Sequence, residues 1–175
     1  IVSGADDDGS GAMALLEIAE AFKLAELDGN RPKRSIVILH VSAEEKGLLG
    51  SKYYTDNPLY PLDETITNLN VDMIGRTDPT RNSNNDEYVY LIGTDRLSTM
   101  LHETSEEVND RTVNLELDYR FNAWDDPNRF YFRSDHFNFA KNNIPVIFYF
   151  SGTHEDYHMP TDTAEKIRYD LLTKR

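Results

Sequence analysis

The sequence contains no cysteine among its 175 residues, which excludes disulfide bonds and thiolate metal ligands. Long apolar runs are also absent. The longest, residues 36–39 and 144–150, suit strands and are far shorter than the roughly 18 residues of a membrane-spanning helix. Basic residues are few, since 18 Lys and Arg stand against 31 Asp and Glu, a formal net charge of −13 at pH 7. Because affinity for a phosphate backbone depends on clustered cations, we expect no nucleic-acid partner.

The apolar residues that are present follow the periods of regular secondary structure. Helical spacing between Ala12 and Ala25 predicts an amphipathic helix. A near-continuous apolar run at residues 35–41 predicts a central parallel strand that is covered on both faces. By the same reasoning, strands are expected at residues 67–73, 88–92, 113–117 and 145–150, and further helices at residues 95–108, 134–142 and 162–173. This alternation predicts a single α/β domain over residues 1–175 with a mainly parallel sheet.

Acidic and imidazole side chains follow three of these strands where each one ends. Glu44 and Glu45 follow the run at residues 35–41, Asp72 ends the next strand, and His158 lies beyond the last. In a parallel sheet, functional residues gather at the carboxyl ends of the strands. Asp72 points most strongly to a function, because a carboxylate within an apolar strand is costly to bury unless it is paired or bound to metal. The two glutamates suit a functional turn and an exposed charged pair equally well.

Oxygen and imidazole ligands without thiolate suit a hydrolytic zinc site, and one carboxylate can bridge two ions. A nearby carboxylate that is not a ligand can accept the proton of the attacking water. Asp6, Asp7 and Asp8, directly before the first expected helix, add a further acidic group, although as a set they also suit a helix cap. A serine hydrolase and a phosphate-loop protein are not indicated, because the sequence has no Gly-x-Ser-x-Gly elbow and no Gly-x-x-x-x-Gly-Lys loop.

Five motifs in a fixed order resemble those of the co-catalytic di-zinc aminopeptidases. That group includes aminopeptidase Y and the bacterial secreted leucine aminopeptidases, and it is related to glutamate carboxypeptidase and glutaminyl cyclase. The motifs are GADDDGSG at residues 4–11, SAEEKGLLGS at 42–51, NVDMIG at 70–75, SDH at 134–136 and YHMPTDT at 157–163. They span nearly the whole chain, so the resemblance is highly specific.

The resemblance implies a three-layer fold, with helices on both faces of a mixed sheet, and a peptidase centre that holds two zinc ions. The ligands that it implies are Asp7, which bridges both ions, Glu45 and His158 on one ion, and Asp72 on the other. Glu44 matches the general base, and Tyr157 matches a hydroxyl that in some members helps to hold the oxyanion. Asp135 and His136 match a motif near the site, and we expect a supporting role for them.

One zinc ligand of the family is not found in this chain. It is a histidine in a His-x-Asp motif, on a strand upstream of the position that Asp7 matches. We therefore expect the chain to be the C-terminal part of the catalytic domain, without its N-terminal strands. We expect it to bind one zinc ion or none and to be inactive or nearly so by itself. Many relatives are exported, which predicts a secreted or periplasmic protein.

The predicted function of the complete protein is that of a zinc-dependent exopeptidase. It would remove N-terminal residues from peptides that have a free N-terminus, using a metal-bridging water and Glu44 as the base. A glutaminyl cyclase-like acyltransferase is an alternative, although Glu44-Glu45 and the motif at residues 157–163 look more like the peptidase. A non-catalytic binding module with the same fold is the other alternative.

Overall fold

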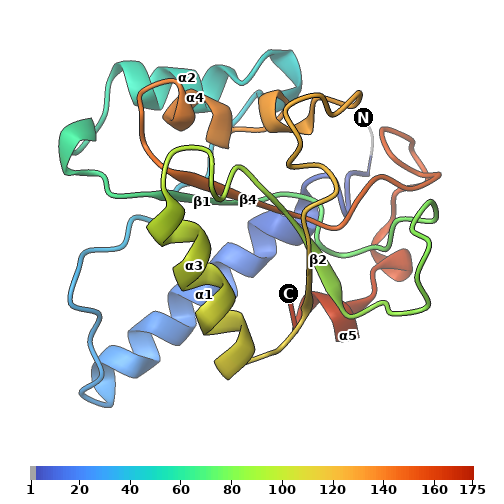
Figure 1. Ribbon diagram of the computed structural model, residues 1–175, viewed down its shortest axis with the longest axis horizontal. Coiled ribbons are helices and arrows are strands. Elements are labelled where there is room, and N and C mark those ends of the chain that lie inside the picture. Colours follow the sequence, from blue (N-terminus) through green and yellow to red (C-terminus); the bar gives the residue numbers. More distant parts are fainter. Residues whose placement is uncertain (1–2) are drawn as a thin grey trace.

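The computed structural model describes residues 3–175, which form a four-stranded sheet between two layers of helices (Figure 1). The strands are β1 (Asn68–Val71), β2 (Tyr88–Ile92), β3 (Glu116–Asp118) and β4 (Val146–Phe150). The helices are α1 (Gly9–Leu27), α2 (Leu49–Asp56), α3 (Thr99–Arg111), α4 (His136–Ala140) and α5 (Tyr169–Leu172). Short 3-10 turns occupy Glu44–Lys46, Leu62–Glu64, Phe130–Phe132 and Ala164–Lys166. Helices α2 and α4 lie on one face of the sheet, and α1 and α3 lie on the other (Figure 1).

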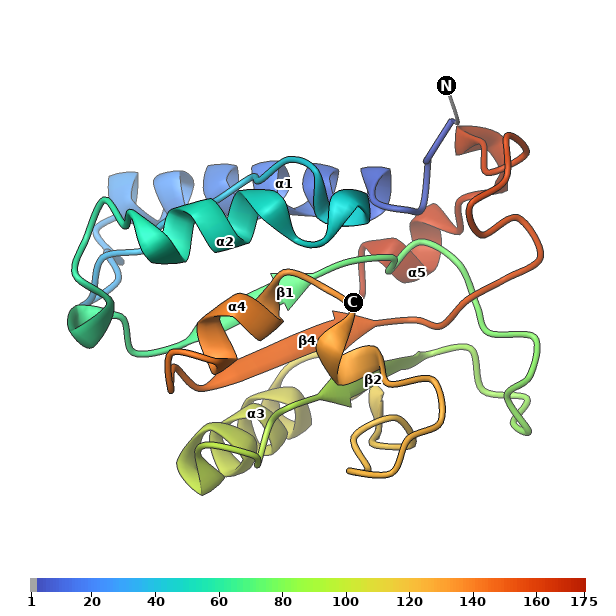
Figure 2. The ribbon, with the colours of Figure 1, turned by 90° about the horizontal axis from the view of Figure 1, so that it is seen from above.

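The strands lie in the order β1-β4-β2-β3, and Figure 2 shows β1, β4 and β2 in succession. β1 runs parallel to β4 and β2 runs parallel to β3, whereas β2 and β4 are antiparallel. The expected fold class, a mixed and mainly parallel sheet with helices on both faces, is thereby confirmed. Because β1 and β4 run in the same direction, their carboxyl ends meet at one edge of the sheet, and the loops that follow them lie together.

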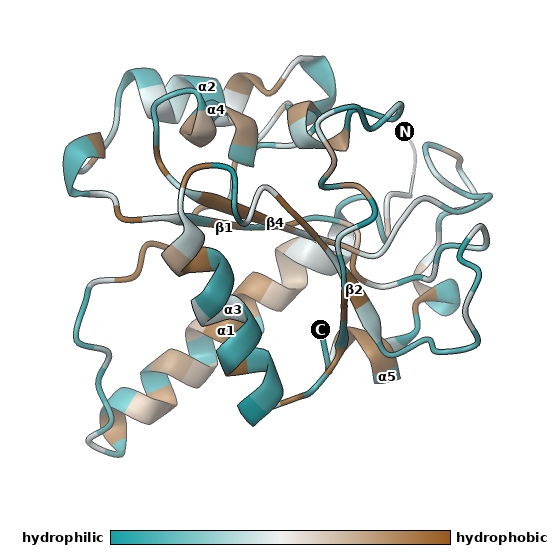
Figure 3. Cartoon of the chain, viewed as in Figure 1, coloured by the Kyte–Doolittle hydropathy of each residue, from teal (hydrophilic) through white to brown (hydrophobic). Residues whose placement is uncertain are grey.

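β2 and β4 are buried on both faces, which explains their near-continuous apolar sequences. Side chains alternate across a strand, so each strand contributes to two separate cores. The larger core, on the face toward α4, includes Tyr88, Tyr90, Ile92, Val146, Phe148 and Phe150. The smaller core, on the face toward α3, contains Val89, Leu91, Leu115 and Ile147. Both strands appear brown in the hydropathy colouring of Figure 3, between mostly paler or teal segments.

The strand predicted at residues 35–41 is wrong. The segment has no strand pairing, and Ile36 and Val37 are each 47% exposed. A strand needs a neighbour for its backbone hydrogen bonds, and none of the four described strands pairs with this segment. Apolar side chains are exposed on α1 as well, among them Met13 and Leu27.

Several predicted boundaries also shift. α3 begins at Thr99 and not at residue 95, because the side chain of Ser98 accepts a hydrogen bond from the backbone N–H of Leu101 at 3.2 Å and caps the helix there. β3 lies at residues 116–118 and not at 113–117, and α4 is shorter than predicted. Residues 162–173 form a 3-10 turn and the four-residue α5 in place of one helix, because the Asp162 carboxylate binds a different loop and caps no helix. Within residues 3–175, every helix is too short or too polar to cross a membrane.

Candidate metal centre

Four loops carry the predicted ligands to one place at the carboxyl ends of β1 and β4. Asp7 precedes α1, Asp72 follows β1, His158 follows β4, and Glu45 lies in the 3-10 turn before α2. One ligand atom from each of Asp7, Glu45 and His158 lies within 4.8 Å of the other two. The Nε2 atom of His158 is 3.1 Å from Asp7 Oδ2 and 3.1 Å from Glu45 Oε1. The structure thus brings together the three residues expected on one ion.

The remaining predicted site residues line the same pocket. Its acidic wall contains Asp7, Glu44, Glu45 and Asp72, and Tyr157 lies beside them. The other lining residues are Met73, Phe130, Arg133, Ser134, Phe148, Phe150 and Thr153. The pocket therefore combines crowded carboxylates with an apolar wall and a single cation.

The two carboxylate oxygens of Asp72 differ in their hydrogen bonding. Its Oδ2 atom accepts a hydrogen bond of 2.6 Å from the hydroxyl of Ser134, and that hydroxyl accepts one of 2.9 Å from Asn70 Nδ2. Its Oδ1 atom is buried and has no hydrogen-bond partner among the described residues. A buried carboxylate oxygen without a partner is costly unless it coordinates a cation, so this atom fits a metal ligand.

The segment after Asp72 is joined to the start of α1 by three successive backbone N–H groups. The bonds run from Met73 to Asp8 Oδ1 at 3.1 Å, from Ile74 to Ser10 Oγ at 3.0 Å and from Gly75 to Asp6 Oδ1 at 2.7 Å. Two glycines permit this close approach. A Cβ atom on Gly75 would lie 2.8 Å from Asp6 Oδ1, and one on Gly11 would lie 2.4 Å from the carbonyl oxygen of Val71. The Gly-Ser-Gly and Asp-Met-Ile-Gly motifs therefore pack directly against each other.

The 3-10 turn that carries the two glutamates has a strained backbone on both sides and is tied to α4 and its N-terminal flank through the residues that follow it. Ala43 before it and Leu48 after it have φ values of 61° and 58°, a left-handed backbone that costs roughly 1–2 kcal/mol for a residue other than glycine. The carbonyl oxygen of Leu48 accepts a 3.0 Å hydrogen bond from Asn138 Nδ2 in α4. At the start of α2, the hydroxyl of Ser51 donates to Asp135. Backbone strain of this kind clusters at functional sites.

Burial and mutual repulsion raise the pKa values of the pocket carboxylates. Burial, followed by the charges of Asp72 and Glu45, raises the pKa of Asp7 to about 7. The same causes in the same order raise the pKa of Glu44 to about 8. Burial is also the first cause that raises the pKa of Asp72, to about 6. Such a cluster favours a divalent cation, and its oxygen and imidazole donors fit zinc.

Tyr157 lies over the candidate ligand His158. Its ring stacks on the His158 ring with 3.8 Å between the centroids, and its hydroxyl oxygen accepts a 3.0 Å hydrogen bond from Arg133 Nη2. Burial raises the pKa of Tyr157 to about 12, so the hydroxyl stays protonated well above neutral pH. Because Arg133 donates a hydrogen bond to the oxygen, the hydroxyl of Tyr157 can use its own hydrogen to donate to another acceptor.

The sequence motifs assigned no role to two neighbours of the site, Arg133 and Ser134. Ser134 is the first residue of the SDH motif at residues 134–136 and Arg133 directly precedes it, so that motif was the signal that could have found them. His136 is fully buried and stacks on Phe148 with 4.7 Å between ring centroids, and it is not among the pocket-lining residues. Asp135 accepts the hydrogen bond from the Ser51 hydroxyl at the start of α2, which agrees with the supporting role expected for it.

Carboxylates and an imidazole gathered at the carboxyl ends of strands in an α/β sheet form the kind of site that metal-dependent hydrolases use. The chain belongs to a peptidase family: the profile described as "Peptidase family M28" matches residues 1–175. The predicted family relationship is thereby confirmed.

Three individual proteins illustrate the relationship. A vacuolar membrane protease of Verticillium alfalfae is 39% identical over 66 residues, which are 38% of this chain and 6% of that protein. An aminopeptidase from Aneurinibacillus sp. strain AM-1 has a TM-score of 0.71 at 24% identity, covering 97% of this chain and 36% of that one. The glutaminyl cyclase of Porphyromonas gingivalis has a TM-score of 0.65 at 20% identity, covering 99% of this chain and 60% of that one. The two structural likenesses show the fold, and in all three cases the chain spans less than two thirds of the protein that it matches.

Proposed function

We propose that the protein is a zinc-dependent aminopeptidase and that residues 1–175 belong to its single catalytic domain. Membership of a peptidase family supports peptide hydrolysis. The chemistry of the pocket supports the metal and the substrate class. Its excess of carboxylates suits the positive charge of a free peptide N-terminus, and its apolar wall suits the side chain of the first residue.

Asp7, Glu45 and His158 would hold one zinc ion, and Asp7 with Asp72 would contribute to a second. Bound zinc polarises a carbonyl group and lowers the pKa of water. The donor atoms of the first set already converge, and Asp72 Oδ1 is unpartnered. In the 175-residue chain we propose that the first set binds the ion more tightly, because it has more protein ligands.

Glu44 is the proposed general base. Its side chain lines the pocket but is not part of the candidate ligand trio of Asp7, Glu45 and His158. Its carboxylate can therefore take a proton from the attacking water. The same group can then return that proton to the amine that leaves. Tyr157 donates its hydroxyl hydrogen to the oxygen that becomes negative, while Arg133 holds the hydroxyl in place from the other side.

The observation that carries this proposal is the convergence of Asp7, Glu45 and His158 from three separate loops. The test is hydrolysis of aminoacyl-p-nitroanilides and dipeptides by the complete protein, before and after chelation and after zinc is added back. We expect activity to disappear on chelation and to return with zinc. Unchanged rates after exhaustive chelation would refute a metal-dependent mechanism. The 175-residue chain assayed alone should be nearly inactive.

A parallel assay with peptides that begin with glutamine separates hydrolysis from ring closure. Release of the first residue supports the aminopeptidase, and loss of ammonia with the peptide intact would support a cyclase.

We further propose that the protein works outside the cytoplasm, in a secreted or periplasmic setting. One relative is named for a vacuolar membrane, and cell fractionation with an antibody to this chain would distinguish the three locations.

A further inference from the structure

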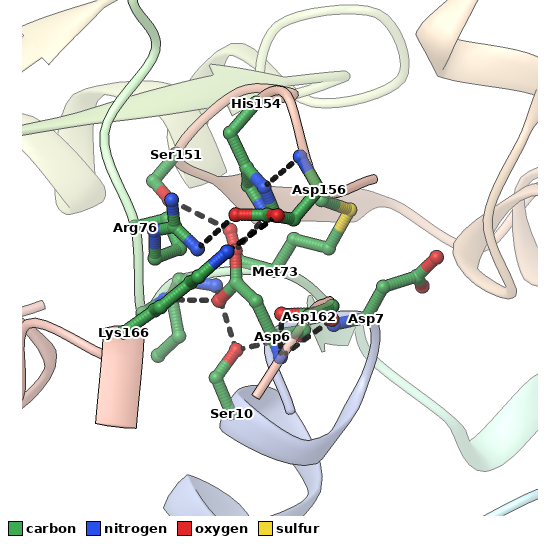
Figure 4. Close-up of polar contacts among 12 residues, drawn as sticks. Asp6, Asp7, Ser10, Met73, Arg76, Ser151, His154, Asp156, Asp162 and Lys166 are labelled. Carbon is green, nitrogen blue, oxygen red and sulfur yellow. Dashed lines mark hydrogen bonds and ion pairs between the residues drawn. The ribbon is translucent and has the colours of Figure 1, made fainter. Parts of the chain in front are cut away.

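A second set of polar side chains lies behind the candidate ligands (Figure 4). It consists of Asp6, His154, Asp156 and Asp162, which we call the anchoring network, and their exposed fractions are 0%, 7%, 4% and 1%. None of the four lines the pocket. Carboxylates are rarely buried this completely, because they lose their hydration unless hydrogen bonds replace it. Three of them in one place therefore require an explanation.

Asp162 joins the loop of His158 to the loop of Asp7. Its two carboxylate oxygens accept the backbone N–H of Asp6 at 3.1 and 3.0 Å, and Oδ2 also accepts the N–H of Asp7 at 3.1 Å. Its backbone carbonyl accepts the N–H of Ala5 at 3.2 Å. Asp162 lies only four residues beyond His158, so these bonds fix the distance between two of the candidate ligand loops.

Asp6 joins the same region to the loop that follows β1. Its Oδ1 accepts the N–H of Gly75, three residues beyond Asp72, and its Oδ2 is 3.1 Å from His154 Nε2. The other ring nitrogen of His154 accepts the backbone N–H of Asp156 at 3.3 Å. The ring proton therefore lies on Nε2 and is donated to Asp6. One carboxylate thus contacts both the loop after β1 and the loop after β4.

Asp156 fixes the far side of this loop to the rest of the molecule. It accepts hydrogen bonds from Lys166 Nζ at 2.6 Å and from Arg76 Nη1 at 3.2 Å. Figure 4 shows Lys166 and Arg76 approaching Asp156, with Asp6 and Asp162 on the side toward Asp7. The network is continuous from the 3-10 turn that precedes α5 to the start of α1.

We propose that Asp6, Asp162 and His154 are positioning residues of the metal centre. They hold the loops of Asp7, Asp72 and His158 in a fixed relation, so that donor atoms from separate loops face one point. This inference rests on the proposed function, because it assumes that those donors bind zinc. A metal tolerates little error in ligand position, and groups that orient ligands commonly change metal affinity by 10- to 100-fold when they are replaced.

The test compares two substitutions of one residue in the complete protein. In His154→Gln the amide can still donate to Asp6, whereas His154→Phe keeps a planar ring without a donor. Zinc affinity is measured by titration calorimetry, and the visible spectrum of the Co²⁺-loaded protein reports the ligand geometry. We expect His154→Phe and Asp162→Asn to weaken zinc binding by about 10- to 100-fold and to alter the cobalt spectrum. His154→Gln should preserve both.

A matched control separates positioning from general stability. The Asn109 side chain makes two 2.9 Å hydrogen bonds with the backbone of Leu115 at the end of α3, outside the pocket lining. Asn109→Ala should lower the melting temperature and leave zinc affinity unchanged. If His154→Phe does not fold, His154→Met provides a second variant without the donor.

The outcomes distinguish the positioning role of these residues from the existence of the metal centre. Zinc affinity and a cobalt spectrum unchanged in both His154→Phe and Asp162→Asn would overturn the positioning role and leave the metal centre standing. Equal losses in His154→Gln and His154→Phe would also overturn it, because the donor to Asp6 would then be irrelevant. A complete wild-type protein that binds no zinc would refute the proposed metal centre itself.

Discussion

Two adjacent glutamates of one 3-10 turn have different surroundings, and replacing each by glutamine tests whether they have different tasks. Glu45 Oε1 lies 3.1 Å from His158 Nε2 and belongs to the candidate ligand trio. Glu44 is half-buried and lines the pocket without joining the trio. Glutamine keeps the size of the side chain and removes its charge and its ability to accept a proton. Glu44→Gln therefore removes the proposed base, whereas Glu45→Gln weakens one of three ligands.

The two substitutions should lower the rate by different routes. Loss of general-base help costs about 10² to 10⁴ in kcat, or about 2.7 to 5.4 kcal/mol in the barrier at 1.36 kcal/mol per tenfold change. Glu44→Gln should show this loss with its zinc content intact, so excess zinc does not rescue it. Glu45→Gln should lose zinc first, and excess zinc should restore part of its rate. Steady-state kinetics with an aminoacyl-p-nitroanilide and metal analysis of the same samples of complete protein supply both measurements.

An exposed glutamate in another 3-10 turn, Glu64, provides the matched control. Glu64→Gln makes the same chemical change away from the pocket and should alter neither zinc content nor rate. Zinc lost from Glu44→Gln but retained by Glu45→Gln would show that the two roles are exchanged. Full activity in both variants would refute the proposed mechanism.

Three further results are expected. His158→Ala should weaken zinc binding far more than His102→Ala in calorimetric titrations, because only His158 belongs to the ligand trio; equal losses would contradict that assignment. Gly11→Ala should destabilise the fold by about 1–3 kcal/mol in urea unfolding, because its Cβ would lie 2.4 Å from the Val71 carbonyl oxygen; unchanged stability would contradict the close packing. Burial lowers the pKa of His136 from 6.5 to about 3, so the unfolded chain binds an extra proton between these values and stability falls as the pH drops below 6.5. At pH 5 this contribution is about 2 kcal/mol, and urea unfolding at pH 7 and pH 5 should show a smaller loss for His136→Phe than for the wild type.

The fold class could be predicted from local patterns, because β2 and β4 are buried on both faces and their sequences are apolar throughout. β2 was predicted with its observed bounds, residues 88–92. The strand at residues 35–41 failed for a reason that lies outside the segment. An apolar sequence indicates side chains that suit burial, and it does not supply the neighbouring strand with which the backbone must pair.

The residues that converge on the pocket could be predicted because their motifs are short and ordered. The residues behind them could not. Asp162 has the sequence context of a helix cap and Asp6 that of an acidic turn, yet both carboxylates accept N–H groups from segments far away in sequence. Local sequence does not indicate which distant backbone N–H group will donate to a carboxylate, and it is this pairing that sets the roles of Asp162 and Asp6.

The attachment of the segment after β1 to the start of α1 also determines where the chain can change in length. Three consecutive N–H groups, from Met73 to Gly75, each donate to a separate side-chain acceptor. One residue inserted before them would therefore displace all three donors from their acceptors. Residues 82–84 in the next connection are all exposed, and additional residues there would extend into solvent. Natural length variation, epitope tags and fused domains should therefore be tolerated in that second stretch and rejected between Asp72 and Gly75.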